Sequence, residues 1–340
     1  MNKRALITTA VCAVFLAALV FVLKFISVPN PLITPKADFT RDTRPPGLEI
    51  SLVGGFTEIT DFFKGVSFDE PHDIYIDAYG CIFVADAGAD CIYKFDKDGN
   101  LMKTIGSFGS GGGKFNYPTA FCFDEKALYV ADNMNHRVQI LDGKNYSYVG
   151  EIPLEENTYK RAEYYTSMTC GGTDELFLSG NFIMGDSCYT YRIDLSPIQL
   201  DQARAAKFQR IDGYLRYYGG TLYMVETYEL KASQGSYMRV AGKHNLTSYT
   251  KGAPGLTYYF EFPLKYMPAD FIIEDGLVYV LSMMHQTLDL FTLEGEYKGT
   301  LHQAGDISDF CYLEKDDDGA FYISCPMDAS VIKLVPNGGG

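Results

Sequence analysis

The sequence predicts an all-β fold, a six-bladed β-propeller, from its composition, a repeated strand pattern and a spare strand near the N-terminus. The 340 residues include 26 Tyr, 23 Phe and 33 Gly, which favours β-strands joined by many turns. A pattern of an apolar, an aromatic, an apolar and a small or apolar residue occurs six times. The copies end at Ala85, Ala131, Ser179, Val225, Leu281 and Ser324, at intervals of 46, 48, 46, 56 and 43 residues. This spacing indicates six structural repeats.

We call each copy the signature strand of its repeat. It is apolar on both faces, as a fully buried strand would be. In the first repeat, strand-like residues 73–77 precede it, residues 92–96 follow it, and a turn at residues 98–100 leads into a fourth strand over 101–106. Four short strands in about 45 residues are typical of one propeller blade. The long interval after Val225 predicts roughly ten extra residues in blade four.

The two ends of the propeller predict how the ring closes. The last repeat ends with a third strand over 331–335, and its fourth strand is missing. A spare strand over 48–54 precedes the first repeat. We expect this N-terminal strand to complete blade six, which would leave few open sheet edges.

The N-terminal segment predicts a membrane anchor. Lys3 and Arg4 precede an apolar run over 5–23, which is long enough to cross a bilayer as one helix. We interpret residues 1–27 as an uncleaved signal anchor or transmembrane helix; a cleaved signal peptide is the alternative. The positive-inside rule then predicts a single-pass protein with a cytoplasmic N-terminus. A Pro-rich tether over 28–47 would join the anchor to an extracellular or periplasmic propeller over 48–337.

Charge and cysteine content bear on the possible partners and disulfide bonds of the protein. Asp and Glu number 43 against 29 Lys and Arg, a formal net charge of −14, which argues against a nucleic-acid partner. Seven of the eight cysteines follow the anchor, and the sequence names no disulfide pair. Cys122 and Cys170 each stand six residues before a signature strand, a place that we interpret as packing.

The first two repeats resemble NHL repeats over residues 71–142. In the second, Ala131-Asp132-Asn133-Met134-Asn135-His136-Arg137-Val138 matches the family pattern, after a glycine-rich linker over 106–115. The first keeps Pro71, Ala85 and Asp86 but has Cys91 where the Arg would fall. The resemblance implies a six-bladed propeller and leaves the function open, because NHL propellers include scaffolds, ligand binders and lyases. We expect Asp86, Asp132 and Arg137 to have structural roles.

Candidate binding residues gather at the predicted channel mouth, where the innermost strands begin. Pro71-His72 is similar to the zinc-binding Pro-His pairs of NHL-like peptidyl-amidoglycolate lyases, but Thr119 and Ala269 occupy the matching places in blades two and five. Three converging ligands are needed for catalytic zinc, so no metal site or cofactor is predicted; zinc or calcium is the alternative. Asp-rich stretches at 96–100 and 316–319 are interpreted as turns. The candidate residues at this mouth are His72, Asp73, Thr119, Arg216, Asp270 and Asp309.

A Tyr-rich, locally basic segment over 226–265 is the second candidate surface. It is either a long hairpin that shields a blade edge or a lip that binds a partner or a sugar. The residues of this candidate lip are Tyr228, Tyr237, Arg239, Tyr249, Tyr258 and Tyr259.

Together these features predict a membrane-anchored, non-catalytic binding module for a protein or carbohydrate ligand. The alternative is an enzyme, a lyase or hydrolase with its site at the channel mouth, resembling peptidyl-amidoglycolate lyase or streptogramin lyase. A scaffold within a larger envelope complex is a third hypothesis.

Overall fold

A computed structural model describes most of the predicted propeller. The described residues are 50–154, 163–172, 174–182, 189–196, 205–209, 213–227, 229–233, 236–240, 244–263, 266–303 and 312–337. The predicted anchor over 1–27 and tether over 28–47 lie outside them. Across the described part of the chain, no helix is long and apolar enough to span a bilayer.

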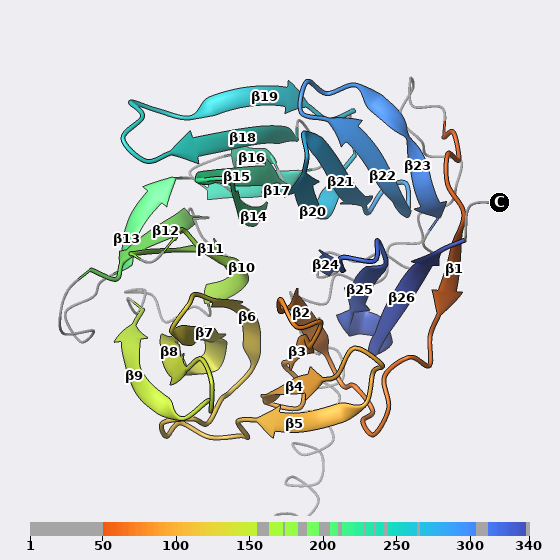
Figure 1. Ribbon diagram of the computed structural model, residues 1–340. Coiled ribbons are helices and arrows are strands. Elements are labelled where there is room, and N and C mark those ends of the chain that lie inside the picture. Colours follow the sequence, from red (N-terminus) through yellow and green to blue (C-terminus); the bar gives the residue numbers. More distant parts are fainter. Residues whose placement is uncertain are drawn as a thin grey trace, which may run out of the picture. The chain divides into compact units, whose positions relative to one another are not determined.

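The described chain forms six four-stranded antiparallel sheets around a common axis (Figure 1). Blade one contains β2 (Pro71–Ile76), β3 (Ile82–Asp86), β4 (Cys91–Phe95) and β5 (Leu101–Ile105). Blade two contains β6 (Pro118–Phe123), β7 (Ala127–Asp132), β8 (Arg137–Asp142) and β9 (Tyr148–Pro153). Blade three contains β10 (Glu163–Cys170), β11 (Glu175–Phe182), β12 (Tyr189–Asp194) and β13 (Ala205–Gln209).

The second half of the ring repeats this arrangement. Blade four contains β14 (Gly213–Tyr218), β15 (Thr221–Glu226), β18 (Asn245–Thr250) and β19 (Thr257–Glu261). Blade five contains β20 (Pro268–Glu274), β21 (Leu277–Ser282), β22 (Thr287–Thr292) and β23 (Tyr297–Gln303). Blade six contains β24 (Tyr312–Lys315), β25 (Phe321–Cys325), β26 (Ser330–Pro336) and β1 (Phe56–Ile59).

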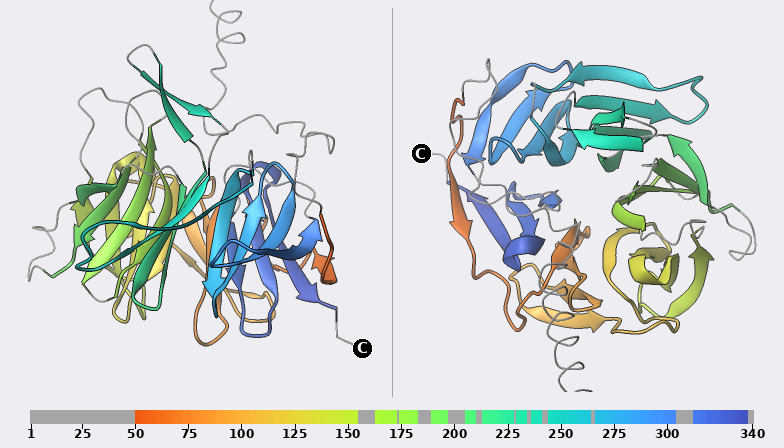
Figure 2. Two further views of the ribbon diagram at one scale, coloured as in Figure 1. Left: turned by 90° about the horizontal axis from the view of Figure 1, so that it is seen from above. Right: turned by 180° about the vertical axis from the view of Figure 1, so that it is seen from behind.

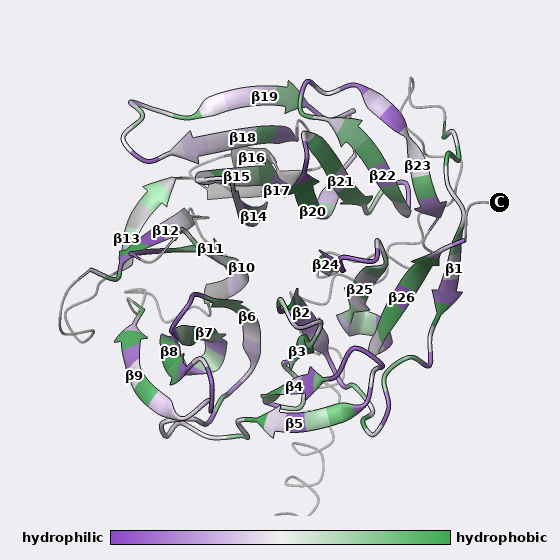
Figure 3. Ribbon diagram, viewed as in Figure 1, coloured by the Kyte–Doolittle hydropathy of each residue, from purple (hydrophilic) through white to green (hydrophobic). Residues whose placement is uncertain are grey.

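The six signature strands are the second strands of the six blades: β3, β7, β11, β15, β21 and β25. Their residues are almost all buried, as the apolar pattern predicts. Hydrophobic residues dominate β21, β25 and β26 (Figure 3). The first strand of each blade lies nearest the axis and contacts the first strand of the next blade. The six-bladed propeller is therefore confirmed.

An N-terminal strand pairs with the last strand of blade six, but it lies later in the sequence than expected. The antiparallel partner of β26 is β1, with Phe56 opposite Pro336 and Ile59 opposite Lys333. Of the expected strand over 48–54, residues 50–54 are described; there Leu52 makes an isolated parallel bridge with Thr300 of blade five. The strand that completes blade six is therefore residues 56–59, and the prediction of residues 48–54 for this role was wrong.

Blade four contains the insertion that the long interval predicts. A separate two-stranded hairpin, β16 (Glu229–Ser233) and β17 (Ser236–Val240), is inserted between its second and third strands. Figure 2 shows this hairpin standing out from one face of the propeller. It is additional to the four strands that complete the blade.

Candidate functional site around the propeller axis

The innermost strands present six residues at one level, each opposite the aromatic residue of its signature strand. Of the six, only Arg216 and Glu314 carry a charge. Arg216 pairs with Tyr223 in blade four, and Glu314 pairs with Tyr322 in blade six. The full set is Tyr75, Cys122, Thr169, Arg216, Ile272 and Glu314.

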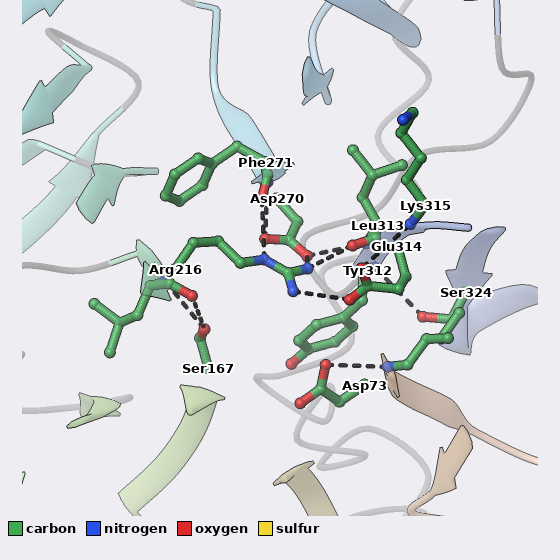
Figure 4. Close-up of polar contacts among 12 residues, drawn as sticks. Asp73, Ser167, Arg216, Asp270, Phe271, Tyr312, Leu313, Glu314, Lys315 and Ser324 are labelled. Atoms are coloured by element: carbon green, nitrogen blue, oxygen red, sulfur yellow. Dashed lines mark hydrogen bonds and ion pairs between the residues drawn. The ribbon is translucent and has the colours of Figure 1, made fainter. Parts of the chain in front are cut away.

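Arg216 connects three blades through its guanidinium group (Figure 4). One terminal nitrogen lies 2.7 Å from the Asp270 carboxylate, and the other lies 3.1 Å from the Glu314 carboxylate. The Nε–H donates to the Phe271 carbonyl at 3.0 Å, and a terminal N–H donates to the Leu313 carbonyl. Because its donors are used by blades five and six, Arg216 stabilises the arrangement of the inner strands.

Asp73 and Asp270 occupy equivalent places and bond to the next blade in the same way. Asp73 Oδ2 accepts the backbone N–H of Phe121 in blade two at 3.0 Å. Asp270 Oδ2 accepts the N–H of Leu313 in blade six at 2.9 Å. In both blades the strand register shifts after a proline, between Pro71 and Ile74 and between Pro268 and Phe271. Such irregularities re-aim side chains, which explains how these carboxylates reach a neighbouring sheet.

Burial controls the ionisation of this cluster. It raises the pKa of Asp73 to about 8; Arg216 and the Phe121 N–H oppose this effect, and the charges of Asp270 and Glu314 add to it. Burial also raises the pKa of Asp270 and that of Glu314, against the opposing effect of Arg216. The cluster thus combines one guanidinium with three carboxyl groups that hold protons more tightly than in water.

His72 lies beside this cluster, among aromatic rings. Its ring centroid is 5.7 Å from that of Tyr117 and 5.9 Å from that of Tyr312. Burial lowers the pKa of His72 to about 3, so the imidazole is neutral at physiological pH. The Tyr312 hydroxyl donates to the Thr166 carbonyl at 2.5 Å, which ties blade six to blade three. Perturbed, buried groups of this kind are candidates for a functional site.

The structure therefore brings some, but not all, of the candidate channel-mouth residues together. Arg216 and Asp270 form an ion pair. Their charges act in opposite directions on the pKa of Asp73. Thr119 is buried and donates to the Tyr165 carbonyl of blade three at 2.6 Å. Asp309 lies outside the described residues.

Sequence reasoning missed Glu314, Tyr312 and Ser167. Ser167 Oγ accepts the Leu215 N–H of blade four at 3.0 Å. Asp73 and Asp270 each accept a backbone N–H of the next blade in the same way. A usable signal existed, since Glu314 stands seven residues before its signature strand and Arg216 six residues before its own. That spacing places both on the innermost strand opposite the aromatic residue.

No group of three or more His, Cys, Asp or Glu among the described residues could hold a metal ion. The Asp-rich stretch at 96–100 is a turn held by its own side chain. Asp96 Oδ1 accepts the N–H groups of Asp98 and Asn100, at 3.0 and 2.8 Å. Asp316 likewise accepts the N–H of Ala320 at 2.8 Å, which agrees with the interpretation of both stretches as turns.

The residues of the candidate lip occupy different environments. Tyr258 is 56% exposed on β19. Tyr249 packs against Phe208 with ring centroids 4.7 Å apart, and Tyr259 packs against Tyr223 at 5.6 Å. Tyr228 and the side chains of Tyr237 and Arg239 lie outside what the structure describes.

The NHL-like residues of blade two form a buried polar cluster. Asp132 is fully buried, and it accepts the Asn116 N–H at 2.7 Å and the Arg137 Nε–H at 2.8 Å. Arg137 also donates to the carbonyls of Gly111 and Lys114, both at 3.1 Å, so it fixes the glycine-rich linker. In blade one, Asp86 accepts three backbone N–H groups, and no arginine is present at the position of Cys91. These bonds confirm the structural roles expected of Asp86, Asp132 and Arg137.

Comparison with known proteins agrees with this signature. A family model described as a 6-bladed beta-propeller matches residues 66–233. The human NHL repeat-containing protein 3 is 28% identical over 89 residues, which are 25% of this chain and 26% of that protein. The chain is an NHL-type six-bladed β-propeller. The match spans about a quarter of the curated relative, so it carries the repeat and not the whole protein's activity.

Solved structures with the same fold include enzymes. A gluconolactonase from Xanthomonas campestris has a TM-score of 0.57 at 12% identity, over 87% of this chain and 96% of that one. Virginiamycin B lyase from Staphylococcus aureus has a TM-score of 0.54 at 11% identity, over 83% of this chain and 99% of that one. At this level of identity the likeness establishes the fold alone.

Proposed function

We propose that this NHL-type propeller is a binding module, and that blade four carries its binding surface for a protein or carbohydrate ligand. The observation that carries the proposal is the β16–β17 hairpin, which forms a two-stranded sheet of its own in addition to the four strands of its blade. Exposed Tyr258 on β19 belongs to the same blade and offers contact area at low entropic cost. Extra segments on a rigid scaffold are common sites of recognition.

The arrangement around the axis supports a non-catalytic role. The charged groups there bond to neighbouring blades: Arg216 to Asp270 and Glu314, and Asp73 to the Phe121 N–H. A catalytic group must instead reach a reacting atom of a substrate. In this proposal the inner residues hold the ring together, and the ligand binds on blade four.

The binding surface is tested on the full chain in detergent, applied to a glycan array and to membrane extracts. Replacing residues 229–240 by a short turn, or changing Tyr258 to Ala, is expected to reduce binding at least roughly tenfold. Tyr79→Ala is the matched control, since Tyr79 is an 89% exposed tyrosine in blade one. Equal binding by all four proteins would contradict the assignment to blade four.

We further propose that residues 1–27 anchor the propeller in a membrane, with the N-terminus cytoplasmic. The apolar run over 5–23 and the preceding Lys3 and Arg4 support this orientation. Resistance to carbonate extraction, together with protease sensitivity of the propeller only from the extracytoplasmic side, is the expected result. Release by carbonate would contradict it.

A second candidate function is a lyase or hydrolase acting at Asp73. The observation that favours it is the buried Asp73 carboxyl group, whose pKa burial raises to about 8, a value suited to a general acid. The names of the similar enzymes suggest virginiamycin B and gluconolactone as test substrates. Turnover that disappears in Asp73→Asn would establish this function, and its absence in a folded wild-type protein would favour the binding module.

A further inference from the structure

Two cysteines on adjacent blades lie side by side near the axis. Cys122 on β6 of blade two and Cys170 on β10 of blade three have their Sγ atoms 2.6 Å apart. The two sulfurs are not joined in the structure. We propose that Cys122 and Cys170 form a disulfide bond that links blade two covalently to blade three. A disulfide bond is about 2.05 Å long, so a small side-chain rotation brings the sulfurs together.

The direction of the Cys122 side chain follows from its place on the inner strand. Arg216, at the same level in blade four, reaches blade five through the Phe271 carbonyl. Residues two positions earlier on the strand also reach the next blade: Asp73 bonds to Phe121 and Ser167 to Leu215. This face of the inner strand therefore carries the junctions between blades.

Blade two lacks a polar group at that earlier position. Ala120 pairs with Ala131 there, and its methyl group cannot make the hydrogen bond that Asp73 and Ser167 provide. Cys122, two residues later, is the next side chain on the same face. A bond to Cys170 would supply the link that the other blades obtain from an aspartate, a serine or an arginine.

The backbone around the two cysteines is already held in position. Thr119 donates to the Tyr165 carbonyl at 2.6 Å, and Asn133 Oδ1 accepts the Tyr165 N–H at 3.2 Å. Both bonds join blade two to blade three near the start of the strands that carry the cysteines. Because these strands are fixed against each other, forming the disulfide bond requires no movement of the blades.

The two thiols differ in exposure, which sets the order of the chemistry. Cys122 is buried, and burial raises the pKa of its thiol well above the usual range. Cys170 is partly exposed. A small-molecule disulfide is the oxidant: the Cys170 thiolate attacks it and releases one thiol, then Cys122 loses its proton, attacks Cys170 Sγ and releases the second. Two protons and two electrons pass from the protein thiols to the oxidant.

The bond is tested by mapping cysteines in the full chain after equilibration with glutathione disulfide and alkylation with N-ethylmaleimide. Digestion after Lys, Arg and Glu separates Cys122 in fragment 115–125, Cys170 in 164–175 and Cys188 in 176–192. The expected product is fragment 115–125 joined to 164–175, two hydrogens lighter than the sum and separated by dithiothreitol. In Cys122→Ser, fragment 164–175 should instead carry glutathione where the first exchange has occurred, or the maleimide where it has not, and no link to fragment 115–125 should form.

Cys91→Ser is the matched control, because Cys91 is a buried cysteine of blade one that should leave the linkage intact. Alkylation of both fragments in oxidised wild-type protein, or a link from either cysteine to Cys188, would overturn the proposal. A second measurement needs no variant to fold: reduction of oxidised wild-type protein should lower its melting temperature by on the order of 5 °C. An unchanged melting temperature would equally overturn the inter-blade link.

Discussion

Arg216 of blade four and Asp270 of blade five form an ion pair 2.7 Å long next to the propeller axis. The Asp270 carboxylate is almost completely buried, and the Arg216 side chain is 23% exposed. The same carboxylate accepts the Leu313 N–H of blade six. One pair therefore fixes three consecutive blades.

Replacing Arg216 by Met should destabilise the propeller by about 3–5 kcal/mol, because Asp270 and Glu314 would be left buried without their cation. Urea unfolding followed by circular dichroism measures the change. Adding Asp270→Asn and Glu314→Gln to the variant should recover part of the loss, since it removes the uncompensated charges. Lys97→Met is the control: Lys97 pairs with Asp98 on the exposed surface, where water screens the ion pair, so its loss should change stability far less than the loss of Arg216.

Asp73 should make stability fall as pH rises. Its pKa in the folded protein is about 8, above the value for an unfolded chain, so the native state binds its proton more tightly. This contribution is complete below pH about 4 and is lost as pH rises to about 8, at up to about 1.4 kcal/mol per pH unit. The Asp73→Asn variant should lack this contribution. Relative to wild type, the variant should therefore become more stable as pH rises from 5 to 8. A difference independent of pH would contradict the assigned ionisation.

His72 should have the opposite effect in acid. Burial lowers its folded pKa to about 3, below the value for an unfolded chain, so the unfolded state binds the proton more tightly. Stability should therefore fall as pH decreases from about 6.5 to 3. His72→Gln cannot gain this charge and should be less sensitive to acid than wild type in thermal melts at pH 6.5, 5 and 4. His136→Gln, a change in a turn between β7 and β8, provides the comparison.

Asp132 should be among the most sensitive positions of the NHL-like signature. Asp132→Ala removes the acceptor of the Asn116 N–H and leaves Arg137 without its buried carboxylate. We expect a loss of about 3 kcal/mol in urea unfolding. Asp98→Ala, in an exposed turn, should change stability by less than about 1 kcal/mol. Similar losses in both variants would argue against a special role for the signature.

The six signature strands could be predicted from sequence because each must be apolar on both faces to lie inside a blade. Their spacing also predicted the insertion in blade four, and the Asp132–Arg137 signature predicted a structural cluster. Closure was harder, because residues 48–54 and 56–59 both read as short strands before the first repeat. Only the pairing of Phe56 with Pro336 distinguishes them.

The inner cluster depended on tertiary structure. Arg216, Asp270 and Glu314 come from three blades, and their contacts depend on shifts of strand register that the spacing of apolar residues does not reveal. The same holds for Cys122 and Cys170, which lie 48 residues apart in sequence and 2.6 Å apart at their sulfurs. The sequence by itself determined the repeat, since burial imposes a local pattern on every blade. Only the closed ring decided which side chains meet at the axis, because those contacts join residues from different blades and no local pattern encodes them.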